Sequence, residues 1–172
     1  MTPPNVLRSP AAATPLIEQI IRYKFKDRGL LARALLPAMV VHGRYLINGS
    51  QDLAHLGHSA LKMILSQDGF HNNEGAGLTE YVILEEAGDS NLWWVGFTKE
   101  LDRFIPKDRV PMSKKAIEEA VANMMKAIMG AVYVDSGYRL EKVANVIDAL
   151  GIGWMEEDPD DSGTDEGSII AV

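Results

Sequence analysis

The side chains best suited to chemistry lie on two well-separated stretches of the chain. His55 and His58 stand three residues apart on one stretch, and Asn123 and Lys126 stand three residues apart on the other. A histidine and a lysine that are partly removed from water can act as general acid and base, because their surroundings shift their pKa values. Cysteine is absent, which excludes disulfides, thiolate zinc sites and a cysteine nucleophile. Chemistry here therefore depends on a fold that brings the two stretches together.

Apolar residues recur at helical spacing along most of the chain. We expect helices over residues 16–24, 28–36, 51–67, 78–86, 113–134 and 140–150, with a mixed segment at 91–104. Asp27 and Ser113 are typical N-cap residues, Pro37 ends the second helix, and glycines at 151 and 153 end the last one. Strand-like alternation does not persist for long. The sequence therefore predicts an all-α fold.

Length and charge suggest one domain with a segment at each end. The chain has 172 residues, of which 47% are hydrophobic, enough for a packed core. We expect a flexible, proline-containing arm at 1–15, a domain at 16–153 and a disordered acidic tail at 154–172. The tail holds seven of the 24 acidic residues and none of the 17 basic ones, so the rest of the chain is neutral. A neutral body with an acidic tail is a poor electrostatic match for nucleic acid.

Composition also bears on location. No apolar run approaches the roughly 18 residues that a membrane span needs. The lack of cysteine fits an intracellular protein, in the cytoplasm or the mitochondrion. No acid precedes Glu18, as in mitochondrial presequences, but the prolines of the arm oppose an amphipathic helix there.

Two motifs carry a resemblance to a known family. Residues 51–61 read QDLAHLGHSAL, and residues 123–137 read NMMKAIMGAVYVDSG. The first resembles the ribonuclease III signature helix, roughly acid-basic-Leu-Glu-Phe-Leu-Gly-Asp-Ala-Val-Leu. The second is similar to that family's Asp-x-x-Glu-Ala-x-x-Gly-Ala-x-Tyr-x-Asp-x-Gly. Weaker matches at 23–35 and 74–79 keep the same order. The chain thus resembles a ribonuclease III endonuclease domain over about residues 16–150, and the resemblance implies that domain's helical bundle.

The resemblance also implies a metal site, and here the chain departs from the family. The family holds Mg²⁺ with carboxylates at i, i+4 on one helix and at i, i+3 on another, and the metals activate water for RNA cleavage. The matching positions are Ala54, His58, Asn123 and Lys126, so their formal charge changes from −4 to +1. Two like charges near 4 Å repel by about 4 kcal/mol at an effective dielectric of 20. We expect no Mg²⁺, no other cofactor and no cleavage by the two-metal route.

Each of these residues also has a purely structural interpretation. His58 taken alone is more often a hydrogen-bonded structural histidine than a functional one. Lys126 can replace the charge of the metal by pairing with Glu119, which lies two turns earlier on the same helix face. A place in the core is the corresponding interpretation for Met124, Met125 and Met129, and packing is the one for Trp93 and Trp94.

The resemblance further implies partners. Ribonuclease III domains form dimers through the signature helix, so we expect a homodimer through residues 51–65. His55 replaces the aromatic residue that packs across that interface in the family. A Thr-His-x-Ser segment common in the family is replaced at 36–39, and no double-stranded RNA-binding domain follows residue 150. We therefore expect weak or no binding of duplex RNA.

Three functions stay open at this point. The first is a catalytically inactive pseudoenzyme that acts as a dimeric scaffold or binding protein for an unknown partner. The second is a repurposed, metal-independent enzyme acting on a small organic substrate. Its site would comprise His55, His58, Asn123, Lys126 and Glu119. The third is a mitochondrial ribosomal protein or a non-cleaving RNA binder, whose basic cluster would comprise Lys107, Arg109, Lys114 and Lys115.

Overall fold

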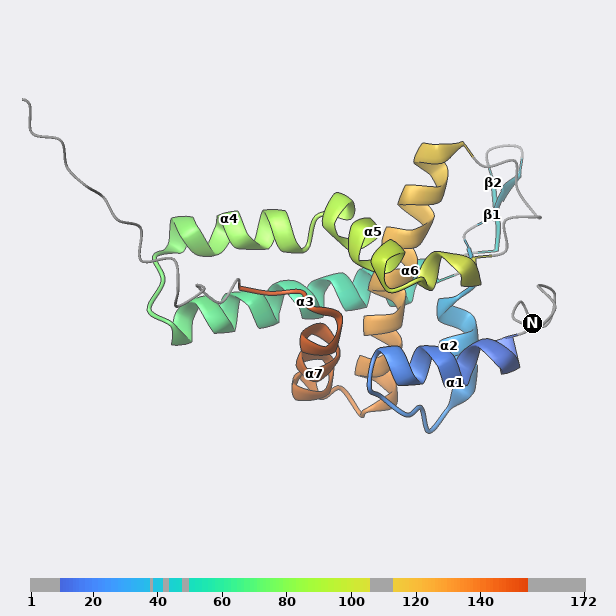
Figure 1. Ribbon diagram of the computed structural model, residues 1–172, viewed down its shortest axis with the longest axis horizontal. Coiled ribbons are helices and arrows are strands. Elements are labelled where there is room, and N and C mark those ends of the chain that lie inside the picture. The colour runs from blue at the N-terminus through green and yellow to red at the C-terminus, as the bar shows by residue number, and fades with distance from the viewer. Residues whose placement is uncertain (1–9, 38, 42–43, 48–49, 106–112, 155–172) are drawn as a thin grey trace, which may run out of the picture.

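The protein is described here from a computed structural model, which covers residues 10–37, 39–41, 44–47, 50–105 and 113–154 (Figure 1). Helices dominate these residues, and the expected all-α class is confirmed. In chain order the elements are α1 (Pro10–Ile20), α2 (Arg28–Ala34), β1 (Met39–Val41), β2 (Arg44–Ile47), α3 (Gln51–His71), α4 (Ala76–Glu86), α5 (Asp89–Thr98), the 3-10 helix η2 (Leu101–Phe104), α6 (Lys114–Asp135) and α7 (Leu140–Leu150).

Helix α6 forms the centre of the core. Helices α2, α3, α5 and α7 all pack against it, and α3 crosses it with the most extensive contact (Figure 1). Ile128 and Met129 are almost fully buried, and Met124 and Met125 are buried beside them. The core position expected for these methionines is therefore confirmed. Burial on nearly all sides explains why the middle of α6 is apolar around most of its circumference.

Helix α1 corrects the boundary of the N-terminal arm. It begins at Pro10 and ends at Ile20, whereas the sequence predicted a helix over 16–24 after a flexible arm. Proline is well suited to the first helical turn, because the N–H that it lacks has no partner there in any residue. Pro15 does remove a hydrogen bond inside the helix. Burial of Ala13 and Ile17 in the core offsets that loss, so residues 10–15 belong to the domain. Residues 1–9 lie outside the described part.

The predicted starts of α2 and α6 and the predicted end of α7 agree with the structure more closely than the predicted start of α1 does. The Asp27 side chain accepts a hydrogen bond from the backbone N–H of Gly29 at 2.8 Å and caps α2. Ser113 caps α6 in the same way, accepting from Ala116 at 3.2 Å. Gly151 adopts φ 75° after α7, the left-handed conformation that glycine takes without strain. Helix α2 ends at Ala34, a little before the proline expected to end it.

Two segments differ from the helical prediction. Strands β1 and β2 pair as an antiparallel hairpin, with Val41 opposite Arg44. Their sequences, MVV and RYLI, are rich in β-branched and aromatic residues and stand two residues apart in the sequence, which is a hairpin signal that is easily missed in such short runs. The mixed segment at 91–104 divides into α5 and η2, and Glu100 between them has φ 56°.

The described chain ends in contact with α3 and α4. The backbone N–H of Gly153 donates to the carboxylate of Glu86 at 3.1 Å, and the indole N–H of Trp154 donates to the carbonyl of Leu65 at 3.4 Å. Trp154 therefore belongs to the domain and not to the acidic tail. The rest of the expected tail, 155–172, lies outside the described residues. Among the described helices, none combines the length and the apolar character that crossing a membrane requires.

Candidate functional site

Two glycines determine how closely α3 and α6 approach. A Cβ atom at Gly57 would fall well inside contact distance of the Lys126 carbonyl oxygen and the Gly130 nitrogen. A Cβ atom at Gly130 would meet the backbone of Leu53 in the same way. The two helix backbones are thus in direct contact, which only glycine permits. Because positions 54 and 58 flank Gly57 and positions 123 and 126 precede Gly130, the crossing gathers the candidate residues.

The four candidate positions occupy different environments at this crossing. Ala54 is buried, with 3% of its surface exposed, and carries no group that binds a metal. His58 and Asn123 are half-buried, and the Lys126 side chain is 17% exposed. His55, three residues before His58 on α3, is exposed. The first four residues are thus buried or partly buried near the crossing, whereas His55 is exposed.

Lys126 forms an ion pair with Asp89, the first residue of α5. The sequence had suggested Glu119 as its partner, and that prediction is wrong. Residues seven apart on a helix are separated by about 10 Å along its axis, whereas residues four apart are neighbours. Glu119 instead lies 3.9 Å from Lys115, four residues before it. The ammonium of Lys126 therefore joins α6 to the start of α5.

Asn123 is engaged with the start of α3. Its side-chain nitrogen donates to the hydroxyl of Ser50 at 3.4 Å, and Ser50 is itself buried. This bond links the N-terminal end of α3 to α6. It directs the amide nitrogen, and not the amide oxygen, towards the nearest polar group of the site. Ser50 was not among the residues singled out by sequence, because its position before α3 predicts only a helix cap.

His58 is the least satisfied polar residue of the site. Its Nδ1 atom is buried without a hydrogen-bond partner among the described residues. Burial lowers the pKa of His58, and the positive charges of Lys126 and Lys62 lower it further, while Asp89 acts in the opposite direction. The imidazole is therefore neutral at pH 7, and it adds no positive charge beside the ammonium of Lys126.

A pocket of about 330 Å³ lies beside this site. Asp89 contributes to its wall, and so does Glu119, but neither His58 nor Lys126 lines it. The remaining lining residues are Ser90, Trp93, Lys115 and Glu118. Of the five residues considered for a repurposed site, the structure brings His58, Asn123 and Lys126 together. It leaves His55 in solvent and Glu119 in this neighbouring pocket.

The fold can now be compared with known structures. Two structures of the nuclease domain of ribonuclease III from Campylobacter jejuni match the chain. One, concerned with structural flexibility in a region involved in dimer formation, has a TM-score of 0.62 at 21% identity and covers 80% of this chain and 98% of its own. The other has a TM-score of 0.64 at 18% identity and covers 83% of this chain and 97% of its own. The chain has the fold of a ribonuclease III nuclease domain. The sequence itself matches no protein-family model and no curated protein.

The residues at the crossing do not fit the Mg²⁺ that the ribonuclease III fold implies. Mg²⁺ prefers several oxygen ligands in octahedral geometry, chiefly carboxylates and water. Here the side chains offer an imidazole, an amide already bonded through its nitrogen, and an ammonium paired with Asp89. Within the described ranges, no three His, Cys, Asp or Glu side chains gather closely enough to hold a metal ion.

Asp135 is a second polar centre of this chain, and its place in the sequence did not mark it as a site residue. Its carboxylate accepts from the hydroxyl of Tyr23 at 2.7 Å and from the backbone N–H groups of Lys26 and Asp27 at 3.0 and 2.8 Å. Asp135 lies in the 123–137 motif, and Tyr23, Lys26 and Asp27 lie in the weaker match at 23–35, so the occurrence of both segments in one chain was the available signal. Burial alone would raise the pKa of Asp135, but the backbone and Tyr23 hydrogen bonds lower it overall. The carboxylate thus fastens the turn before α2 to the end of α6.

Proposed function

We propose that this chain is a catalytically inactive relative of the ribonuclease III nuclease domain, which acts as a dimeric scaffold or binding protein. The observation that carries the proposal is the ion pair between Lys126 and Asp89 at the crossing of α3 and α6. An ammonium occupies the region in which the resemblance implies divalent cations. Its pairing with Asp89 gives the charge a structural use, in holding α5 against α6.

A cleavage assay tests this proposal directly. The full chain at micromolar concentration, incubated with long duplex RNA in Mg²⁺ or Mn²⁺, is expected to release no fragments above a buffer control. The reason is that the site lacks the carboxylates that bring metal-bound water to the scissile phosphate. An active ribonuclease III, assayed in parallel, controls for the RNA and the buffer. Metal-dependent cleavage by this chain would overturn the proposal.

Binding of duplex RNA without cleavage receives little support from charge. Lys114 and Lys115, the described half of the expected basic cluster, each lie 3.9 Å from a glutamate one turn later, at positions 118 and 119. Lys107 and Arg109 lie outside the described residues. Paired cations contribute less to phosphate binding than free ones do. We therefore rank an RNA-binding role, including one as a mitochondrial ribosomal protein, below the scaffold role.

Exposed apolar side chains support self-association. Large apolar residues in water are uncommon on a monomer when they gather on a few elements. Seven of the nine exposed large hydrophobic residues of the described part lie on α3, α4 and α5: Met63, Phe70, Leu78, Tyr81, Leu84, Trp94 and Phe97. The proposed homodimer uses the 51–65 segment of α3, on which Met63 and His55 are exposed.

Replacing His55 with aspartate is expected to weaken this dimer at least about tenfold. A tenfold change corresponds to about 1.4 kcal/mol, less than the usual cost of burying an unpaired charge. Sedimentation velocity over a range of micromolar concentrations measures the effect. Asn145→Asp adds the same charge on the exposed face of α7 and is the matched control. A wild-type chain that sediments as a monomer throughout, or two variants that behave alike, would refute an interface at residues 51–65.

A repurposed, metal-independent enzyme is the second candidate. The buried, unpartnered Nδ1 of His58 and the lowered pKa of that residue favour it, because a neutral imidazole can accept a proton at pH 7. Two observations favour the scaffold instead. Asp89 already neutralises Lys126, and the neighbouring pocket is lined by neither residue of the acid–base pair. We therefore place the enzyme second.

A further inference from the structure

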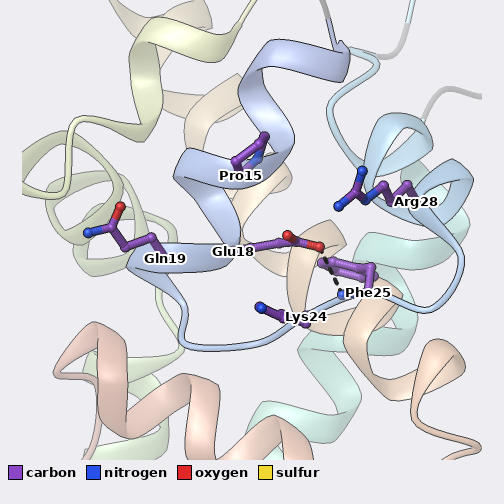
Figure 2. Close-up of a pocket in the computed structure, with 6 residues that line it drawn as sticks. All are labelled: Pro15, Glu18, Gln19, Lys24, Phe25 and Arg28. Atoms are coloured by element: carbon purple, nitrogen blue, oxygen red, sulfur yellow. Dashed lines mark hydrogen bonds between the residues drawn. The ribbon is translucent and has the colours of Figure 1, made fainter.

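A second pocket lies between α1 and the turn that leads into α2. It measures about 490 Å³, within the range of small-molecule sites. Six residues line it, and Figure 2 shows them as sticks: Pro15, Glu18, Gln19, Lys24, Phe25 and Arg28. None of them belongs to the candidate site at the α3–α6 crossing. The pocket is therefore separate from the candidate site at the crossing.

A buried carboxylate lies in the middle of this pocket. Only 9% of the surface of Glu18 is exposed. One of its oxygens accepts a hydrogen bond from the backbone N–H of Phe25 at 3.0 Å, and the other points away from that bond, towards Pro15 (Figure 2). A largely buried carboxylate favours positive or donating groups beside it, because burial penalises its negative charge.

Two cations flank the carboxylate at a distance. In Figure 2 the guanidinium of Arg28 reaches in from the α2 side, while the ammonium of Lys24 extends on the other side of Glu18. Both residues are exposed, and neither forms an ion pair with an acid in the described part of the chain. With Glu18 the pocket carries a net charge of +1. It thus presents one negative group at its base and two free positive groups at its rim.

We propose that this pocket binds a free amino acid with an acidic side chain. Such a ligand carries one ammonium and two carboxylates, for a net charge of −1, which complements the pocket group by group. The ammonium would face the second oxygen of Glu18, and the carboxylates would face Arg28 and Lys24. Arg28 can hold a carboxylate with two parallel hydrogen bonds, and the rings of Pro15 and Phe25 provide apolar walls for the connecting methylenes.

A titration of the full chain with L-glutamate tests this site. Backbone amide shifts, followed by NMR, are expected to move saturably at Gln19 and Phe25, with a dissociation constant below about 1 mM, as for a small ligand held by a few charged contacts. Lys24→Gln and Arg28→Gln are each expected to weaken binding about tenfold. Lys99→Gln removes the same charge at the end of α5, outside the pocket, and is expected to change nothing.

Glu18→Gln distinguishes recognition from a structural role. The glutamine carbonyl can still accept from Phe25, so the local backbone is kept, but the charge facing the ammonium is lost. L-glutamate is then expected to bind about tenfold more weakly, whereas glutarate, which lacks the ammonium, is expected to bind more tightly because repulsion by Glu18 is removed. A circular dichroism melt checks that the variant folds. The proposal is overturned by changes in the same direction for both ligands, or by no saturable shift with L-glutamate up to about 10 mM.

Discussion

Replacing Gly57 with alanine is expected to lower the free energy of unfolding by about 3 kcal/mol, at the upper end of the usual cost of overpacking a core. The new methyl group would collide with the backbone of α6 at Lys126 and Gly130, and backbone atoms cannot rotate aside as a flexible side chain can. Alanine favours a helix over glycine by about 1 kcal/mol, which offsets only part of the collision. Urea unfolding followed by circular dichroism measures the change.

Gly77→Ala is the matched control for this experiment. Gly77 also lies in a helix, α4, but a Cβ atom there would meet nothing within 4 Å. The same substitution is therefore expected to leave stability unchanged or to raise it by up to about 1 kcal/mol. Equal behaviour of the two variants would mean that α3 and α6 do not touch through Gly57. The comparison thus tests the contact that gathers the candidate site.

Placing four carboxylates at the crossing is expected to create a Mg²⁺ site. The variant combines Ala54→Glu, His58→Asp, Asn123→Asp and Lys126→Glu, which changes the formal charge of these positions from +1 to −4. Without metal it should be less stable than the wild type, since carboxylates near 4 Å repel by about 4 kcal/mol at an effective dielectric of 20. With Mg²⁺ at 100 times its dissociation constant, about 2.7 kcal/mol of stability should return.

Thermal melting with and without Mg²⁺ measures this effect. The three-residue variant that keeps Lys126 is the control, and its melting temperature should respond much less, because the ammonium still repels the cation and pairs with Asp89. If the four-residue variant shows no metal-dependent stabilisation, the two helix faces do not converge as described. If the wild type responds as strongly as the variant, the site binds metal despite its altered residues.

The long helices were predictable because each buries a regular apolar face. In α6, buried apolar residues recur from Val121 to Val132 and predict a helix with one face in the core. Capping residues such as Asp27 and Ser113 indicate where helices begin. The start of α1 was not predictable by the same rules. Proline has a low intrinsic propensity for helix interiors, so the local sequence opposes a helix here. Burial of Ile17 in the core favours the helix, but that burial depends on the rest of the fold.

The sequence located part of the candidate site, but it also included His55 and Glu119, which lie outside it, and it missed Ser50 and Asp89. The motif spacing located His58, Asn123 and Lys126, and the fold brings all three to one crossing. The partner of Lys126 was mistaken because sequence spacing reveals neighbours only along one helix. Asp89 lies 37 residues away, on a helix whose position depends on packing. The pocket around Glu18 had no sequence signature either, since its shape depends on how α1, the turn after it and the first residue of α2 fold against one another.

The hydrogen bonds of Asp135 bear on how the chain folds during its synthesis. They join residues that are 108 to 112 positions apart. A ribosome adds residues from the N-terminus, at about 5–20 per second, so the turn at 23–27 emerges several seconds before its anchor. Over that interval α2 lacks the surface of α6 against which it packs, and α1 has only α2 beside it. The N-terminal part of the nascent chain is therefore exposed to chaperones until the GAVYVD segment of α6 has left the exit tunnel.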